Sequence, residues 1–441
     1  MRKLLSAILC GTIILGMSGC SDRSEKYQDC EPGNRYIMLD GVMETENGYY
    51  ARRRNHMGNM LELCYYDKES EKAIYLCSKP ECSHDGGEFC TATDKDIEPD
   101  HITMSDGYVY ISGTEYSKAD ETLSWKLYRA NSDGTEFTEV CTYQKQKNLE
   151  NVGRAVTSTY YMDDLIIHRG YAIVPFYDYE NPSLMYDCVA NTMIIDLENG
   201  QCKRLPALDY DITKLEHGQL GYYVEGDYLY YYIEPPTYIN TRHLYRYNLV
   251  TGETERIETN TRLWSFVVLN DVVYYITVPT EEQNYIPFYA YDIATGEEKD
   301  LSAKLSPYNS GEREPHLNSN LVCDGKYVYF MSPFYNGKWG QFYFMMSEDM
   351  ETQVHFEAPK EMQDYYTELK LSNGKAYFVG EVTISNGDAA ETIEDIIWIT
   401  SSIAYSCPVE DIAAGNIEWT LAYDFTEFEM SLLGERADEI I

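Results

Sequence analysis

The hydrophobic and polar positions of this chain repeat in a regular order: a tight turn, an aromatic-rich strand, a variable loop, a second strand and another tight turn. One copy begins at Gly226-Asp227, continues as YLYYYIE and then HLYRYNL, and ends at the turn 250–253. The next copy begins at Asn270-Asp271, continues as VVYYITV and FYAYDI, and ends at the turn 294–297. A repeat of this length predicts structural units that stack on one another or surround an axis.

The turn that opens each unit can be placed seven times. Most copies are pairs such as Asn-Gly or Asp-Gly, which two-residue hairpins favour because both residues need positive φ. A third strand, such as LELCYYD or FYFMMS, and a more polar fourth strand complete most units. Four antiparallel strands repeated about seven times predict an all-β protein with a single β-propeller over residues 35–425. The irregular seventh unit leaves six or eight blades open. The seven pairs are Asn47-Gly48, Asp106-Gly107, Arg169-Gly170, Gly226-Asp227, Asn270-Asp271, Asp324-Gly325 and Asn373-Gly374.

Segments shaped like D-G-x-V-Y and L-Y-x-Y-D-x-x-T-G-E resemble the blades of quinoprotein-like and low-density-lipoprotein-receptor-like propellers. This resemblance implies the fold alone, because propellers of this kind carry many unrelated functions. The sequence contains neither the Trp-Asp blade endings of the WD type nor the Ser-x-Asp-x-Gly-x-x-Trp boxes of sialidases. Both of those classes are therefore disfavoured.

The first twenty residues have the pattern of an export signal rather than of a folded element. Arg2 and Lys3 form a charged start, and the apolar residues 4–17 are too few to span a bilayer. The ending Met17-Ser18-Gly19-Cys20 resembles a bacterial lipobox, which implies cleavage after residue 19 and lipidation of Cys20. An ordinary signal peptide cut near Gly19 is the alternative. Residues 20–34 then form the lipidated cysteine and a polar tether, and the protein is predicted on the extracellular face of a bacterial cell membrane.

The charge of the chain is strongly negative. Removal of residues 1–19 leaves 33 basic against 73 acidic residues, a formal charge of −40. Nucleic acids and anionic membrane surfaces have the same sign of charge, so the sequence disfavours both as partners. We expect a monomeric domain kept soluble at the cell surface, with residues 426–441 as an acidic C-terminal tail. The 43 tyrosines favour β-strands first and aromatic ligand binding second.

The connections between strands predict two unequal faces of the disc. Connections after the first and third strands of each unit are short, as at Asn270-Asp271 and 294–297, and they define what we call the turn face. Connections after the second and fourth strands are long and variable, and they define the loop face. We expect ligands at the loop face, because binding residues concentrate in loops that a rigid scaffold holds.

Aromatic residues are the predicted binding residues of the loop face. Flat rings beside acidic and amide side chains suit a glycan, peptide or protein ligand. The alternative is that these rings only pack the loops onto the blades. The residues are Phe176, Tyr177, Tyr179, Tyr238, Tyr285, Phe334, Tyr335 and Trp339.

The segment LCSKPECSHDGGEFC concentrates metal-binding side chains. Cys77, Cys82, His84 and Cys90 lie within fourteen residues, a set that suits a tetrahedral zinc site. It also resembles a cysteine-histidine insert of propeller lipoproteins of Gram-positive gut bacteria, a family without assigned activity. Because exported proteins keep disulfides, pairing of Cys64 with Cys77 and of Cys82 with Cys90 is a second interpretation. Reduced, unbound thiols are a third.

Five other cysteines lie singly in or beside predicted strands, and we interpret them as small buried hydrophobic residues. They are Cys141, Cys188, Cys202, Cys323 and Cys407. Catalytic motifs are missing from the sequence, which has no Gly-x-Ser-x-Gly elbow, phosphate loop or His-Glu-x-x-His. The sequence therefore favours a surface-anchored binding module. The alternatives are a glycosidase or lyase with carboxylates near the propeller axis, and a scaffold for envelope assembly.

Overall fold

The structure of the 441-residue chain is a computed structural model. The described residues are 26–30, 43–54, 61–77, 98–117, 122–132, 135–146, 165–179, 188–205, 220–233, 242–260, 262–280, 283, 285–305, 320–335, 338–349, 351, 353–362, 367–385 and 398–426.

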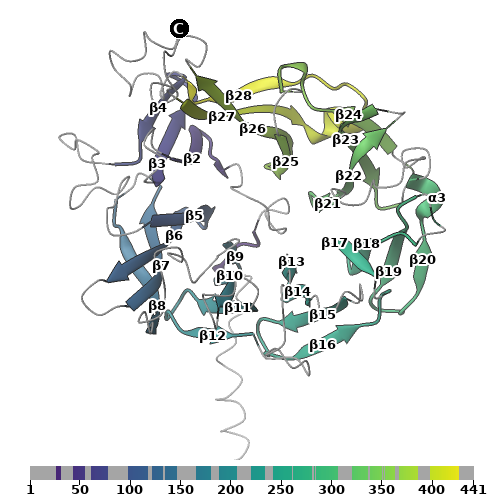
Figure 1. The fold of residues 1–441 in the computed structure, drawn as a ribbon, viewed down its shortest axis with the longest axis horizontal. Helices are drawn as coiled ribbons and strands as arrows, with labels where there is room; N and C mark the ends of the chain where they lie inside the picture. Colours follow the sequence, from purple (N-terminus) through teal and green to yellow (C-terminus); the bar gives the residue numbers. More distant parts are fainter. Residues whose placement is uncertain are drawn as a thin grey trace, which may run out of the picture.

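Seven four-stranded antiparallel sheets surround a central axis, each built from four consecutive strands (Figure 1). The predicted seven-bladed β-propeller is thus confirmed. The blades are β1 Met43–Glu44, β2 Gly48–Arg54, β3 Leu61–Asp67 and β4 Lys72–Tyr75; β5 Glu98–Ser105, β6 Tyr108–Ser117, β7 Thr122–Asn131 and β8 Thr138–Gln146; β9 Ile166–His168, β10 Tyr171–Tyr179, β11 Cys188–Asp196 and β12 Cys202–Arg204; β13 Leu220–Glu225, β14 Tyr228–Ile233, β15 His243–Asn248 and β16 Thr254–Ile257; β17 Leu263–Leu269, β18 Val272–Thr277, β19 Phe288–Asp292 and β20 Glu298–Asp300; β21 Asn320–Cys323, β22 Tyr327–Tyr335, β23 Lys338–Ser347 and β24 Gln353–Glu357; β25 Thr367–Ser372, β26 Lys375–Ser385, β27 Trp398–Pro408 and β28 Thr420–Asp424.

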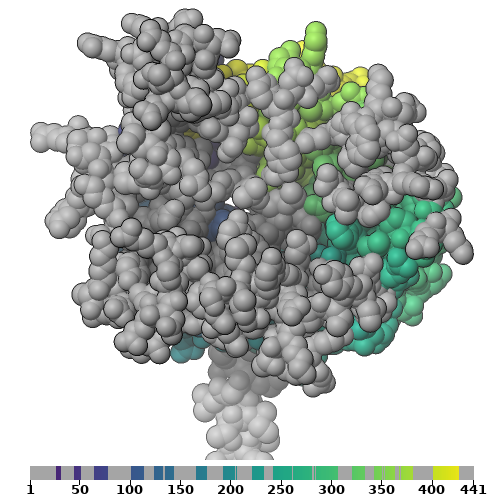
Figure 2. All heavy atoms as spheres, in the orientation of Figure 1, coloured from purple at the N-terminus to yellow at the C-terminus, as the bar shows by residue number. Residues whose placement is uncertain are grey.

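The first strand of each blade lies nearest the axis and the fourth lies at the outer rim (Figure 1). Two short helices follow outer strands, α3 (Ser302–Leu305) after β20 and the 3-10 helix η5 (Lys360–Met362) after β24, whereas α4 (Val409–Ala413) connects β27 to β28. In the space-filling view, atoms of the fifth blade are seen along the outer edge of the ring (Figure 2). Among the described residues, no helix has the length and apolar character needed to cross a membrane.

The predicted turns join the first two strands of each blade. Asp106 and Gly107 have φ of 52° and 79°, and Asn270 and Asp271 have φ of 52° and 60°. Backbone with positive φ is strained for most residues but tolerated by Gly, Asn and Asp, which explains the residue types of these pairs. Asn47-Gly48 differs, because Gly48 already begins β2 and its amide binds the Thr45 side chain at 3.0 Å.

The hydrophobic core lies between the blades, because each sheet is covered on both faces by its neighbours. Along β14, Leu229 and Tyr231 pack toward the third blade, whereas Tyr230 and Tyr232 pack toward the fifth. Alternate residues of a strand point to opposite faces, so strands buried on both sides contain nearly continuous apolar runs. Tyrosine suits such positions because its ring can be buried while its hydroxyl reaches a polar partner, as Tyr232 does at the Trp264 carbonyl, at 3.4 Å.

The ring closes between the first and seventh blades through side chains. Tyr49 and Tyr66 of the first blade pack against Tyr377 and Tyr423 of the seventh. Beside this cluster, the Glu44 carboxylate accepts hydrogen bonds from the ammonium groups of Lys68 and Lys375, each at 2.8 Å, and from the Tyr377 hydroxyl. Only 7% of the Glu44 side chain is exposed.

Strand boundaries differ from the predicted ones at two kinds of position. The polar segment TEFTEV, residues 135–140, is where the sequence places the fourth strand of the second blade, but that strand, β8, begins only at Thr138. Aromatic segments assigned to loops extend the strands instead: β10 continues to Tyr179 and β22 to Tyr335. The hairpins grow longer there because aromatic residues favour extended backbone and pair across strands.

Candidate functional site

The predicted aromatic binding residues of the loop face occupy different settings. Tyr285 lies half-buried between β18 and β19, as predicted, next to the fully buried Ile286. Phe334 pairs with Trp339 across the β22–β23 hairpin, so these two residues and Tyr335 lie on strands rather than in a loop. Phe176, Tyr177 and Tyr179 lie on β10. The side chains of these six strand residues, and Tyr238 as a whole, lie outside the described part.

The predicted zinc or disulfide set is described only at Cys77. This residue follows β4 and lines a cavity of about 530 Å³ with Tyr50 and Tyr65. Cys64 packs in the cluster that contacts the seventh blade, both cysteines have the reduced form in this structure, and their pairing stays a prediction. Cys82, His84, Cys90 and the lipidation candidate Cys20 lie outside the described residues. Within the described ranges, no group of three or more His, Cys, Asp or Glu side chains could hold a metal ion.

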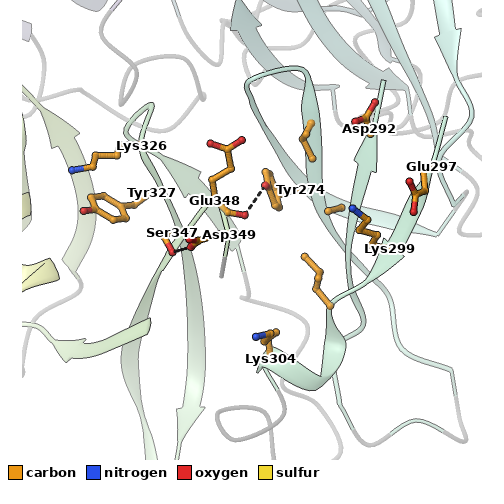
Figure 3. Close-up of a pocket in the computed structure, with 13 residues that line it drawn as sticks. Tyr274, Asp292, Glu297, Lys299, Lys304, Lys326, Tyr327, Ser347, Glu348 and Asp349 are labelled. Carbon is orange, nitrogen blue, oxygen red and sulfur yellow. Dashed lines mark hydrogen bonds between the residues drawn. The ribbon is translucent and has the colours of Figure 1, made fainter. Parts of the chain in front are cut away.

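A cavity of about 680 Å³ lies between the fifth and sixth blades (Figure 3). Glu297, Lys326 and Glu348 lie in connections that follow a first or third strand, so the cavity opens at the turn face. Lys299 on β20 and Lys304 on α3 line its outer side (Figure 3). Tight turns hold Glu297, Lys326 and Glu348, whereas Lys299 and Lys304 come from the outer strand and the short helix after it.

Tyr274 lies at the base of this cavity and links the two blades. Its hydroxyl donates to the backbone carbonyl of Glu348 at 3.2 Å (Figure 3), and the side-chain amide of Asn270 donates to the Glu348 carboxylate at 3.0 Å. Burial, with the nearby Glu348 carboxylate, raises the pKa of Tyr274 to about 12. The phenol therefore stays protonated at neutral pH and remains a hydrogen-bond donor.

Charges of both signs line the opening of the cavity. The backbone and hydroxyl of Thr295, helped by Lys299, lower the pKa of Asp292. The Ser347 hydroxyl and the Glu351 amide, helped by Lys304, lower the pKa of Asp349. Both carboxylates are thus ionised at neutral pH, and each lies within electrostatic reach of a lysine. Such a surface can bind a ligand that has cationic and anionic groups a few ångströms apart.

The cavity lysines differ in their bonding. The Lys326 ammonium binds the Glu410 carboxylate of the seventh blade at 2.7 Å and lies 4.9 Å from the centre of the Tyr327 ring. Lys299 and Lys304 are exposed, and within the described part of the chain neither forms an ion pair at bonding distance. These two ammonium groups are therefore available to an incoming anionic group.

A short N-terminal segment, residues 26–30, binds a different sector of the turn face. The backbone amide of Gln28 donates to the Asp106 carboxylate at 2.9 Å, and the backbone carbonyl of Gln28 accepts from the backbone amide of Arg169 at 3.1 Å. The Arg169 guanidinium binds Asp29 and, at 2.6 Å, Asp227. The segment thereby contacts the opening turns of the second and third blades directly, and that of the fourth through Arg169.

A buried histidine completes the contact of this segment. The Cys30 amide donates to Nδ1 of His168 at 3.2 Å, so Nε2 of the neutral ring is the donor to the Gly226 carbonyl at 2.6 Å. At the start of the segment, the Lys26 ammonium binds the Glu198 carboxylate in the turn between β11 and β12. The predicted tether therefore includes residues that belong to the folded domain.

The sequence analysis predicted neither the cavity between the fifth and sixth blades nor the binding of residues 26–30 at the turn face. The cavity residues come from separate segments between Val272 and Asp349, and each segment by itself is ordinary. The one available signal was the unusual pair Arg169-Gly170, because arginine is disfavoured at positive φ; its φ is 47°. Such a residue at a turn indicates a role for its side chain, here two ion pairs.

Comparisons with known proteins identify the fold and no family. No family model matches the chain, and no curated protein matches it. Among solved structures, the Pyrococcus horikoshii acylaminoacyl peptidase is similar at 11% identity and a TM-score of 0.50, and covers 92% of this chain. A puromycin hydrolase mutant follows at 10% identity, a TM-score of 0.48 and 88% coverage. This chain spans 55% of each of those two chains.

A third similar structure is the β-propeller domain of the Trilobed protease from Pyrococcus furiosus. It has 12% identity and a TM-score of 0.40, with 72% of this chain and 83% of that domain covered. At identities this low the likeness concerns the fold. The chain is similar in fold to propeller domains of peptidases.

Proposed function

We propose that this chain is a lipid-anchored binding module on the extracellular face of a bacterial membrane. Its resemblance to propeller lipoproteins of Gram-positive gut bacteria supports that setting. One observation carries the binding role: the cavity between the fifth and sixth blades, with two exposed lysines, several carboxylates and a buried tyrosine hydroxyl. A rigid scaffold that presents fixed charges in a recess suits recognition better than chemistry.

The ligand that best suits this cavity is a charged peptide segment of an extracellular protein. In a peptide with a carboxylate near a basic side chain, the carboxylate would bind Lys299 and Lys304. The basic side chain would bind Glu297 or Glu348. A neutral glycan would leave these charges without a partner, and desolvation of unpaired charges is unfavourable. The strongly negative chain, at −38, further favours partners with a basic surface.

The bound N-terminal segment supports the proposed anchor. Five residues lie between Cys20 and Lys26, so this stretch can span about 20 Å when extended. A lipid on Cys20 would therefore hold the turn face of the second to fourth blades close to the membrane. The cavity lies in another sector of the ring, between the fifth and sixth blades (Figure 1), where it would stay accessible at the rim.

The binding proposal can be tested with the full chain and peptide arrays of defined charge. Peptides with both basic and acidic residues should bind, and increased salt should weaken the binding because exposed charges are screened. Lys299→Ala combined with Lys304→Ala should reduce affinity about tenfold, or ~1.4 kcal/mol. Lys360→Ala, an exposed lysine on η5, is the matched control and should have no effect.

Two results would contradict the proposal. Binding of charged peptides that the double lysine variant leaves unchanged would place the site elsewhere. Selective binding of neutral glycans would favour the aromatic residues of the loop face instead. The anchor has a separate test: Cys20→Ser should release the protein from the membrane fraction into the medium, whereas retention in the membrane would exclude lipidation at Cys20.

A further inference from the structure

Cys141 and Cys202 come from different blades and meet at the boundary between the second and third. Cys141 lies on the outer strand β8, and its buried side chain joins a hydrophobic cluster that includes Ile195 and Leu197 of the third blade. Cys202 begins the outer strand β12, directly opposite Ile195. Residues that pair across two strands point to the same face of the sheet, so Cys202 also points toward the second blade.

The turn before Cys202 approaches the second blade closely. Gly200 has a φ of 69°, and a Cβ atom added there would lie 2.6 Å from the Val140 carbonyl oxygen and 4.0 Å from the Cβ of Cys141. Only glycine fits this approach, because real Cβ atoms do not come within 3.0 Å of backbone oxygen. Cys202 follows two residues later with its sulfur 3.6 Å from the Gly200 carbonyl. The turn thereby sets Cys202 beside Cys141 at the boundary between the two blades.

We infer that Cys141 and Cys202 form a disulfide that joins the outer strands of the second and third blades. Both residues have the form of reduced cysteines in this structure. A bond requires close approach of the two Cβ atoms from side chains that face each other. The shared boundary, and the close approach of the Gly200 turn to Val140 and Cys141, favour that arrangement. Compartments outside the cytoplasm allow such bonds to persist.

The environments of the two thiols assign them different chemical roles. Cys202 is exposed, and the hydrogen bond from Cys141 lowers the pKa of the Cys202 thiol. The same hydrogen bond, together with burial, raises the pKa of the Cys141 thiol. The thiolate is the nucleophile in disulfide exchange. Cys202 is therefore the attacking residue, and Cys141 is the one that resolves the intermediate.

The oxidant is a disulfide compound, such as a thiol–disulfide oxidoreductase of the exported compartment. The Cys202 thiolate attacks one sulfur of that disulfide, forms a mixed disulfide and displaces the other sulfur as a thiolate, which takes up a proton. Cys141 then loses its proton and attacks the Cys202 sulfur, which releases the second thiol of the oxidant. The two cysteines lose two electrons and two protons, and the oxidant gains both.

Oxidised glutathione provides a direct test on the folded full chain. After incubation, reduced cysteines are labelled with N-ethylmaleimide, and the unreduced digest is analysed by mass spectrometry. We expect a cross-linked peptide pair that contains Cys141 and Cys202, with loss of label at both positions. Cys202→Ser should abolish the cross-link, and Cys141→Ser should leave glutathione attached to Cys202. Cys188→Ser is the matched control, because Cys188 shares a tryptic peptide with Cys202; it should leave the cross-link unchanged.

Three outcomes would overturn the inference. Full labelling of Cys141 and Cys202 after oxidation would show that the pair does not react. A wild-type protein that stops at glutathione bound to Cys202 would show that Cys141 cannot resolve it. A cross-link from either residue to another cysteine would show that the two blades do not hold the pair together.

Discussion

Replacement of Glu44 by glutamine should weaken the closure of the ring. The carboxylate of the first blade binds Lys375 and Tyr377 of the seventh, and it also binds Lys68 beside it. Burial alone would raise the pKa of this carboxyl. Hydrogen bonds from Lys375, Lys68 and Tyr377 outweigh burial and lower the pKa of Glu44 from 4.5 to about 2. Glutamine keeps the shape but removes the charge that these three groups share.

The expected size of the effect follows from that pKa. One pKa unit corresponds to 1.36 kcal/mol, so the charged form of Glu44 contributes about 3 kcal/mol to the free energy of unfolding at neutral pH. Lys68 and Lys375 are 30% and 36% exposed, so water replaces part of their bonding in the variant. We therefore expect Glu44→Gln to lower the free energy of unfolding by about 2–3 kcal/mol.

The pH dependence provides an independent check. A carboxyl whose pKa is lower in the folded state stabilises the protein fully above its unfolded pKa, and this stabilisation is lost as the pH falls toward the folded pKa. The window for Glu44 therefore extends from about pH 4.5 to about pH 2. The difference between wild type and Glu44→Gln should shrink from about 2–3 kcal/mol at pH 7 to about 1 kcal/mol at pH 3.

Urea unfolding followed by circular dichroism at several pH values measures this difference. Glu46→Gln is the matched control, because Glu46 lies exposed in the same turn. It contacts Lys68 only through its backbone carbonyl, at 3.5 Å. If Glu44→Gln unfolds at the same urea concentration as Glu46→Gln, or if their difference grows on acidification, Glu44 does not stabilise the closure of the ring.

Three further changes test other contacts. Arg169→Gln should release residues 26–30 and speed tryptic cleavage after Lys26. Arg256→Gln, which removes an exposed ion pair of 3.0 Å, is the control and should leave the cleavage rate unchanged. Equal cleavage rates in the two variants would contradict the docking of the segment. Tyr274→Phe removes the 3.2 Å bond to Glu348 and should cost about 1 kcal/mol in urea unfolding, and no cost would show that water replaces it. Oxidation to the Cys141–Cys202 disulfide should raise the free energy of unfolding of the wild type by about 4 kcal/mol, the value for a closed loop of about 60 residues. It should not stabilise Cys202→Ser. An equal rise in both proteins would refute the disulfide.

The sequence predicted those parts of the fold that local rules determine. Positive φ at Asn270 and Asp271 requires residue types that can be recognised in the sequence. Strand periodicity then placed β18 and β19 on either side of the loop that contains Tyr285. The repeat of this local pattern was sufficient to predict seven blades, because each blade is formed by consecutive strands.

Contacts between blades could not be predicted in the same way. Glu44 and Lys375 are far apart along the chain, and only closure of the ring brings them to 2.8 Å. Cys202 was expected to be buried but is exposed, because β12 has only three residues and lies at the outer rim. Cys141, Cys323 and Cys407 are buried as predicted. A one-dimensional pattern identifies strands, whereas the environment of a side chain also depends on the blade beside it.

Side chains in the tight turns bind the blades to one another around the turn face. Arg169 binds Asp227 between the third and fourth blades, and the Asn270 backbone amide lies 3.4 Å from the Glu225 carboxylate between the fourth and fifth. The pairs Asn270–Glu348, Lys326–Glu410 and Lys375–Glu44 continue this series across the next three boundaries.

These bonds differ in strength because they differ in exposure. Both members of the Lys326–Glu410 pair are exposed, so water and salt screen it and its contribution is small. Glu44 is nearly buried at the boundary where the chain ends of the propeller meet. Among the described strands, none is shared by the two blades at that boundary, since each sheet is formed from consecutive strands. Among the described ion pairs between blades, the one with the most buried carboxylate therefore lies where the first and last blades meet.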